Sequence, residues 1–380
     1  MTLIKQERIM NMMSSSRLYA SAGLPAKAIN GRGTQLAPPN RFETISREAF
    51  DDGWPDTEDE PSAPRTTLLR DATRRIITRN DSPDLPFEQS ANPYRGCEHG
   101  CIYCFARPSH AYLGFSAGLD FETKIICKPD AARLLEKELS RPGYKPAPLV
   151  LGSNTDPYQP VERSLAITRA LLEVLERFNN PVAIVTKSAG ILRDMDILAR
   201  MAAKGQARVH ISLTTQDTRL SRLMEPRAAS PARRLAAISS LTEAGIPVTI
   251  MAAPLIPGLN DAELESLLEA GAKAGASAAA MSLVRLPHEV AELFAAWLQT
   301  NLPERAAHVL SLIRQCRDGQ LNDPRFHQRF TGTGAIPEML HQRFERVSRA
   351  LGLAGVQSRL NCASFAIPGG TSSTHQLTLL

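Results

Sequence analysis

The stretch NPYRGCEHGCIYCFARP, residues 92–108, carries three cysteines within eight residues: Cys97, Cys101 and Cys104. Their spacing is C-x3-C-x2-C, and the whole chain of 380 residues has six cysteines, too few for a disulfide scaffold. Two glycines in the stretch, Gly96 and Gly100, allow a tight loop in which the three thiols converge. Such a set indicates a bound metal, because soft thiolates select zinc, copper(I) or an iron–sulfur cluster.

Three kinds of site fit this spacing. A zinc site needs a fourth ligand, for which His99 and His110 are candidates, although neither belongs to a second half-site. A thioredoxin-like pair of Cys101 and Cys104 leaves Cys97 unexplained. A four-iron cluster normally takes four thiolates, so three thiolates leave one iron open, as in a catalytic rather than a structural metal site.

The composition is that of an ordinary globular protein, with 43% hydrophobic residues, 22% charged residues and a formal net charge of +5. This charge is too small to indicate nucleic-acid binding by itself, and 5% aromatic residues disfavour a broad base-stacking surface. The N-terminus lacks the apolar core of a secretory signal, and no apolar run is long enough to span a membrane. We therefore expect a cytoplasmic protein, in which clustered thiols indicate metal binding or catalysis.

Residues 86–301 alternate short β-branched runs with amphipathic helices, which predicts a parallel α/β sheet. The predicted strands lie at 149–152, 182–186, 209–213, 248–251 and 279–284. Apolar residues at helical spacing predict helices over 161–178 and 191–202, and Asn260 with Glu263 has the pattern of a capping box at the start of a further helix. Ligands bind at the carboxyl ends of parallel strands, so the residues that follow each strand are the candidate site residues.

Two extensions flank this core. Residues 1–85 contain an acidic segment at 51–60 and an arginine-rich segment at 65–79, and we expect a largely extended or disordered arm. Residues 302–380 predict a helical C-terminal extension, which we expect to act as a lid over the open side of the core.

The cysteine motif, with the aromatic Tyr103 before its last cysteine and a strand–helix repeat after it, resembles the radical S-adenosylmethionine (SAM) superfamily. The resemblance covers roughly residues 30–350 and includes NGRGTQLAPPNRFE, TDPYQPVE, VTKS, ISLTT, MEPRAASPARRL and APLIPGLND. In this order the segments are similar to an uncharacterised bacterial subgroup, distantly related to spore photoproduct lyase and often labelled a DNA repair photolyase. The resemblance implies a partial (β/α)6 TIM-like barrel of the radical SAM type, with N- and C-terminal extensions.

The resemblance also implies a chemistry. Cys97, Cys101 and Cys104 would bind three irons of a [4Fe–4S] cluster, and the fourth iron would bind SAM. An electron from a donor such as flavodoxin or ferredoxin would cleave SAM to methionine and a 5′-deoxyadenosyl radical. That radical would abstract a hydrogen from a substrate that the resemblance does not name, with nucleic acid as one candidate.

By the same resemblance, each strand end supplies part of the SAM site. The candidates in this sequence are Tyr103, Asn154, Thr155, Asp156, Lys187, Ser188, Ser212, Thr214, Ile256 and Arg285. Their expected partners are the SAM amino group for Asn154, Thr155 and Asp156, its carboxylate for Lys187, the ribose for Ser212 and Thr214, the adenine for Ile256, and the substrate or the SAM carboxylate for Arg285.

The resemblance to spore photoproduct lyase is incomplete. That enzyme relies on a cysteine near the end of the second strand as a hydrogen donor, whereas this chain has Gly152-Ser153-Asn154 there. Splitting of a thymine dimer by that route is therefore not implied, and among the remaining cysteines only Cys127 is a candidate donor. The alternative function is a zinc-stabilised nucleic-acid-binding protein that uses the arginine-rich segment and performs no radical chemistry.

Overall fold

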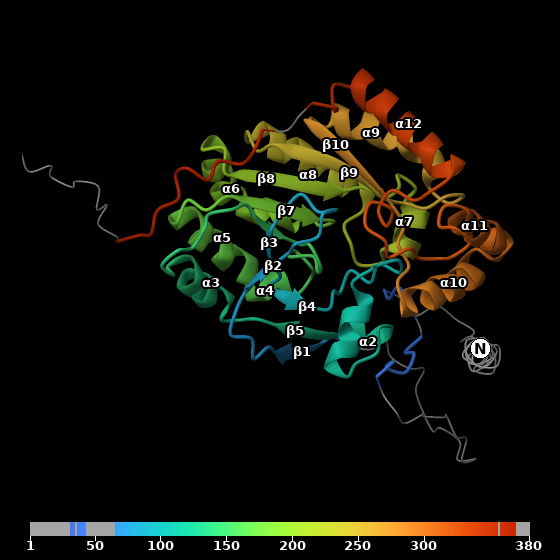
Figure 1. Cartoon of the computed structure of the whole chain (residues 1–380), viewed down its shortest axis with the longest axis horizontal. Helices are drawn as coiled ribbons and strands as arrows, with labels where there is room; N and C mark the ends of the chain where they lie inside the picture. Colours follow the sequence, from blue (N-terminus) through green and yellow to red (C-terminus); the bar gives the residue numbers. More distant parts are fainter. Residues whose placement is uncertain (1–30, 35, 43–64, 356–357, 370–380) are drawn as a thin grey trace, which may run out of the picture.

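The computed structural model describes residues 31–34, 36–42, 65–355 and 358–369. Within these residues the main layer is a seven-stranded sheet in the order β10-β9-β8-β7-β6-β3-β2 (Figure 1). The strands are β2 (Ile77–Arg79), β3 (Gln89–Ala91), β6 (Leu149–Leu151), β7 (Val182–Thr186), β8 (Ala207–Ser212), β9 (Val248–Leu255) and β10 (Ala278–Leu283). Neighbours from β3 to β10 are parallel, and β2 runs antiparallel to β3. The predicted α/β fold with a parallel sheet is confirmed.

The five predicted strands correspond to β6 through β10, but the sequence analysis missed β3, the first parallel strand. Its three residues, Gln-Ser-Ala, have no β-branched run and therefore give no strand signal. All three are buried, and β3 pairs in parallel with β6, so tertiary packing rather than local preference makes this segment a strand. The cysteine loop follows β3 after the short strand β4 (Tyr94–Arg95), much as the polar segments follow the later strands.

Helices connect successive parallel strands and bury their apolar sides against the sheet in one large hydrophobic core. They are α3 (Ala131–Leu139), α5 (Ile167–Arg177), α6 (Met195–Ala203), α8 (Pro231–Glu243) and α9 (Leu264–Lys273). Shorter elements lie around the site: η1 (Arg107–Leu113), α2 (Leu119–Thr123), α4 (Glu162–Leu165), η2 (Ala189–Asp194), α7 (Thr218–Met224) and η3 (Asp261–Glu263). The helix predicted over 191–202 is thus η2 followed by α6.

The helix predicted over 161–178 is divided into α4 and α5 at Ala166, which has a left-handed backbone with φ 50°. The break allows the first turn of α5 to bond to other groups. The Thr168 amide donates to a carboxylate oxygen of Glu162 at 3.0 Å, and the Thr168 hydroxyl donates to the carbonyl of Pro157 at 2.6 Å. These bonds tie the start of α5 to the loop after β6.

The capping box predicted at Asn260 and Glu263 is wrong. The Asn260 amide donates to the carbonyl of Thr214 at 2.7 Å, and its oxygen accepts from the Ile256 amide at 2.7 Å. Glu263 accepts hydrogen bonds from the Thr215 hydroxyl and from a neighbouring amide. Both side chains therefore bind the loop after β8 or the turn after β9 instead of a helix end, and α9 begins at Leu264.

The described part of the N-terminal arm is more ordered than we expected. Residues 67–70 form β1, which pairs with β5 (Lys124–Cys127), and β5 pairs with β4 (Tyr94–Arg95) in a second, three-stranded sheet. β2 pairs with β3 and forms the edge of the main sheet opposite β10. Backbone pairing with the body gives this polar segment its order, although it has little apolar core; the acidic segment 51–60 lies outside the described residues.

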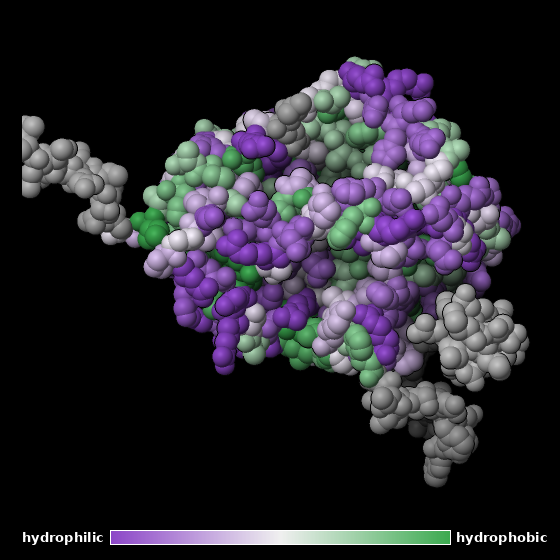
Figure 2. All heavy atoms as spheres, viewed as in Figure 1, coloured by the Kyte–Doolittle hydropathy of each residue, from purple (hydrophilic) through white to green (hydrophobic). Residues whose placement is uncertain are grey.

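The C-terminal extension, residues 302–380, contains α11 (Pro303–Gln315) and α12 (Ala335–Ala350), and α10 (Glu289–Asn301) is the last helix before it. The extension also bonds to the outer edge of β10, where the amides of Leu283 and Ala279 donate to the carbonyls of Phe330 and Leu353 at 2.9 and 3.2 Å. Figure 2 shows that the outward surface of α12 is largely hydrophilic. None of the described helices has the length and apolarity to cross a membrane.

Ala166 offers a test of the helix break. Ala166→Gly should raise the free energy of unfolding by about 1 kcal/mol, because glycine adopts a left-handed backbone without the steric cost that Cβ adds. Ala170→Gly, within α5, should lower it by about 1 kcal/mol. Urea unfolding of the two variants measures both, and a destabilised Ala166→Gly would show that the backbone at this position is not left-handed.

Candidate active site

The cysteine loop lies at the carboxyl end of β3 and is packed against a segment of the N-terminal arm. Gly96 and Gly100 have φ of 81° and 67°, which favours glycine at both positions. A Cβ on Gly33, in the arm, would lie 1.7 Å from the carbonyl oxygen of Gly100. The Gly33 amide also donates to Glu122 at 2.9 Å. The arm therefore touches the backbone of the loop, and only a glycine fits at position 33.

Four side-chain contacts fix the loop, which has no regular secondary structure between Cys97 and Cys104. They join elements that are far apart in the chain: Arg107 to Glu122 at 2.6 Å, Glu98 to Arg227 at 3.2 Å, His99 to Asp156 at 3.3 Å, and the Tyr103 hydroxyl to Glu225. Arg107 and Glu122 are fully buried. The loop is thus held from its outer side by α2 and from its inner side by the ends of the strands and of α7.

The three thiols of the loop are in an environment that disfavours free thiolates. Burial raises the pKa of Cys97, Cys101 and Cys104 above the ordinary thiol value, and nearby acidic groups raise it further at Cys97 and Cys101. A bound metal would supply the positive charge that such thiolates need. Among the described residues, no three His, Cys, Asp or Glu side chains are placed around a single ion.

This arrangement bears on the choice between zinc and a cluster. A zinc site requires its ligands to converge on one ion, whereas a four-iron cluster takes each thiolate on a different iron. Three thiols on one loop are a donor set that either group could use. Soft donors on a single loop fit an iron–sulfur cluster.

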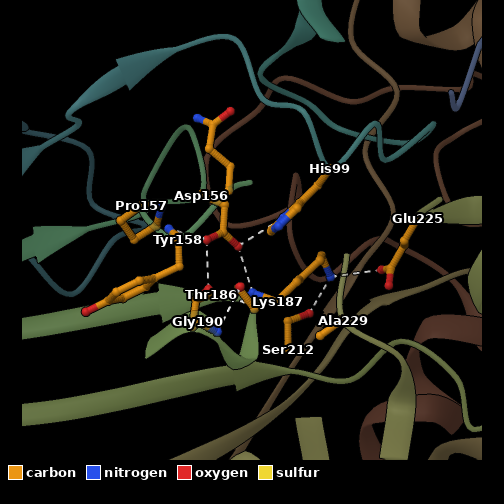
Figure 3. A network of polar contacts seen from close by, with 12 residues as sticks. His99, Asp156, Pro157, Tyr158, Thr186, Lys187, Gly190, Ser212, Glu225 and Ala229 are labelled. Atoms are coloured by element: carbon orange, nitrogen blue, oxygen red, sulfur yellow. Dashed lines mark hydrogen bonds and ion pairs between the residues drawn. The ribbon is translucent and has the colours of Figure 1, made fainter. Parts of the chain in front are cut away.

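Asp156, after β6, is the centre of one group of polar contacts. It accepts from the Thr186 hydroxyl and the Lys187 amide at 2.7 Å each, and it pairs with His99 of the cysteine loop (Figure 3). Burial alone would raise the pKa of Asp156, but His99 and these hydrogen bonds hold the pKa below its ordinary value. An ionised Asp156 thus links the ends of β6 and β7 to the cysteine loop.

Lys187, after β7, is the centre of a second group. Its ammonium contacts the hydroxyls of Ser212 and Thr214 and pairs with Glu225 at 3.1 Å (Figure 3). It also lies 5.5 Å from the centre of the Tyr103 ring. Five side chains from the cysteine loop, β7, β8 and α7 therefore meet here, four of which were predicted site residues: Tyr103, Lys187, Ser212 and Thr214.

Glu225, which the sequence analysis missed, carries the negative charge of this group. It is fully buried and accepts hydrogen bonds from Tyr103, Thr214 and Arg234. Burial would raise the pKa of Glu225, yet Arg234 and Lys187 outweigh it and hold the pKa well below the ordinary value. The segment MEPRAASPARRL was quoted only for the family resemblance, because a carboxylate at the end of a short helix gives no local sign of burial.

The other predicted residues have different surroundings. The Thr155 hydroxyl donates to the carbonyl of Tyr94, while the Asn154 side chain makes no hydrogen bond to the described residues. The Ser188 hydroxyl accepts from the Gly190 amide and caps η2. Ile256 is buried in the apolar cluster that also contains Cys101 and Tyr103.

Two positions, Gly152 and Cys127, bear on whether a cysteine could act as the hydrogen donor. A Cβ on Gly152 would lie 2.1 Å from the carbonyl oxygen of Val185, so no cysteine fits at this position. Cys127 is buried in β5 of the smaller sheet, its thiol lies 3.9 Å from the carbonyl of Ile125, and burial raises its pKa to about 11. Its role as a donor stays a prediction.

Comparison with known proteins identifies similar chains. The model of the radical SAM superfamily matches residues 91–271. An uncharacterised protein of Mycobacterium tuberculosis is 36% identical over 233 residues, which cover 61% of this chain and 68% of that protein. An uncharacterised protein of Methanocaldococcus jannaschii is 26% identical over 172 residues, which cover 45% and 62%.

Solved structures of spore photoproduct lyase have a similar fold. The complex with the dinucleoside spore photoproduct gives a TM-score of 0.54 at 16% identity, covering 75% of this chain and 79% of that one. A mutant of the same enzyme gives a TM-score of 0.55 at 17% identity, covering 77% and 81%. At this identity the likeness shows the fold, a partial TIM-like barrel, as the sequence predicted.

Glu225→Gln tests the buried carboxylate. Removing its charge leaves Arg234 and Lys187 without their partner, which should lower the free energy of unfolding at pH 7 by about 3 kcal/mol. Because the folded state holds the pKa of Glu225 low, its contribution is present above about pH 4.5 and is lost as the pH falls. The difference between variant and wild type should therefore shrink from pH 5 to pH 3.

Urea unfolding at several pH values measures both effects. Glu176→Gln is the matched control, since Glu176 pairs with Arg200 on an exposed helix surface and its loss should change the midpoint far less. Equal midpoints for Glu225→Gln and wild type at pH 7 would contradict the assigned network.

Proposed function

We propose, because the chain belongs to the radical SAM superfamily, that it binds a [4Fe–4S] cluster through Cys97, Cys101 and Cys104 and reductively cleaves SAM. One observation supports this most strongly: the three cysteines lie on a single loop at the carboxyl end of the first parallel strand. The polar groups that follow the next strands, Asp156 and Lys187, face that loop. When bound, cluster and SAM supply a 5′-deoxyadenosyl radical that abstracts a substrate hydrogen.

The residues of this chain protect such a site from water. Cys97 and Cys101 are buried, and Cys101 packs with Tyr103 and Ile256 in an apolar cluster. The N-terminal segment around Gly33 presses against the outer side of the loop. A site closed on these two sides keeps a reactive species away from solvent and leaves the strand ends for SAM.

The polar residues differ in what they can offer SAM. The Lys187 ammonium is already engaged by Glu225, Ser212 and Thr214, so a SAM carboxylate would have to displace one of these contacts. We propose that Lys187 chiefly holds the ends of β7 and β8 against Tyr103. Asn154 has an uncommitted side-chain amide beside Asp156, which makes it the better candidate for a direct contact with the SAM amino group.

The reaction requires a one-electron donor, for which we propose a flavodoxin or a ferredoxin. Nucleic acid remains a candidate substrate, since spore photoproduct lyase, whose structure contains a dinucleoside spore photoproduct, shares the fold. That enzyme's donor cysteine has no counterpart at Gly152, so the proposal does not extend to its reaction.

Anaerobic reconstitution with iron and sulfide tests the proposal. The wild-type chain should bind about four irons and, when reduced, convert SAM to 5′-deoxyadenosine. Cys101→Ser should lose cluster iron and form no 5′-deoxyadenosine, because one iron lacks its thiolate. Cys362→Ser, in a half-buried position of the C-terminal segment, is the matched control and should behave as wild type. A colourless wild-type protein that binds zinc under these conditions would overturn the proposal.

A further inference from the structure

Arg285 is the second residue after β10 and lies beside the end of the cysteine loop. Its guanidinium carbon is 5.4 Å from the centre of the Phe105 ring and 4.8 Å from that of Phe330. Phe105 is the residue after Cys104, and 45% of its surface is exposed. Val284 and Leu286, on either side of Arg285, pack in the apolar cluster that contains Cys101 and Tyr103. Arg285 is therefore at the edge of the proposed reaction site.

The guanidinium has no negative partner among the described residues. Its Nε is buried without a hydrogen-bond acceptor. The nearby carboxylate of Asp84 is engaged by Arg329 at 2.5 Å and by the amide of His327 at 2.6 Å. Burial, together with the positive charges of Arg329 and Arg317, lowers the pKa of Arg285 to about 10. Buried cations are normally paired, so this position lacks an anion.

We propose that Arg285 binds an oxyanion of the substrate, either a phosphoryl group or a carboxylate. The planar fork of N–H donors suits such a group, and the two phenyl rings hold the guanidinium while leaving donors free for it. The exposed ring of Phe105 offers an apolar contact to the part of the substrate next to the oxyanion.

This inference rests on the proposed function, which makes the cysteine loop the reacting centre. Arg285 follows β10, whereas Asp156 and Lys187 follow β6 and β7, and β8 and β9 lie between β7 and β10 in the sheet. Phe330, from the C-terminal extension, helps to enclose it. The oxyanion is therefore assigned to the substrate and not to the carboxylate of SAM.

The stability of Arg285→Met separates a binding role from a structural one. An arginine that stabilised the fold would lower the unfolding midpoint when replaced. We expect Arg285→Met, in a buffer without phosphate or carboxylate, to be at least as stable as wild type. The substitution removes an unpaired, partly buried charge and keeps an apolar side chain between the rings. A clearly lower midpoint would favour the structural role and overturn the proposal.

Anion binding is measured on the reconstituted full chain, first without and then with SAM, as the shift of the thermal unfolding midpoint with added phosphate or acetate at constant ionic strength. Arg285→Met should weaken the apparent affinity at least about tenfold, and Arg285→Lys, which lacks the fork, should restore it only in part. Arg200→Met, on an exposed helix surface, is the matched control. A response to phosphate alone would assign a phosphoryl group, and a response to acetate alone a carboxylate.

Three results would overturn the inference: no response to either anion, an equal response in Arg285→Met, or a response that disappears when SAM is added, which would assign Arg285 to the cofactor. Failure of the proposed function is seen separately, as absence of cluster iron and of 5′-deoxyadenosine in the same preparation.

Discussion

Three thiolates can serve one cofactor only if the loop that carries them keeps a single shape, and this loop has no helix or strand to give it one. Its shape depends on side-chain contacts with other elements, made by Arg107, Glu98, His99 and Tyr103. The Arg107–Glu122 pair is fully buried, so removal of one member would leave an uncompensated charge. The same contacts place the ends of β6, β7 and α7 around the cysteines, so one network fixes both the three thiols and the polar groups that face them.

The extensions at both ends of the chain complete the half-barrel. A sheet that does not close leaves two edges with unpaired backbone groups. Here β2 pairs with one edge, and the carbonyls of Phe330 and Leu353 accept from the other. The same C-terminal segment brings Phe330 over Arg285, so the part of the chain that covers the edge also shapes the side of the site assigned to substrate.

The sequence was most informative where function or packing imposes a local pattern. The cysteine spacing marked the loop on which the strand ends converge, and β-branched runs marked β6 to β10, whereas β3 has neither feature and depends on its neighbours. Glu225 was missed because its partner Tyr103 comes from a distant segment and nothing local indicates that Glu225 and the nearby Arg234 are buried together. The local pattern at Asn260 predicted a capping box wrongly for a similar reason, because the Asn260 side-chain amide donates to the carbonyl of Thr214, which follows a different strand. Long-range polar partners decide these positions.

The electron paramagnetic resonance spectrum of the reduced, reconstituted chain, recorded before and after addition of SAM, tests whether three cysteines hold a cluster with one open iron. If they do, the reduced protein gives the signal of a [4Fe–4S] cluster, and SAM changes that signal because it binds the iron that lacks a thiolate. A cluster signal that SAM leaves unchanged, or no cluster signal at all, would contradict the assignment of this loop as the SAM-binding iron–sulfur site.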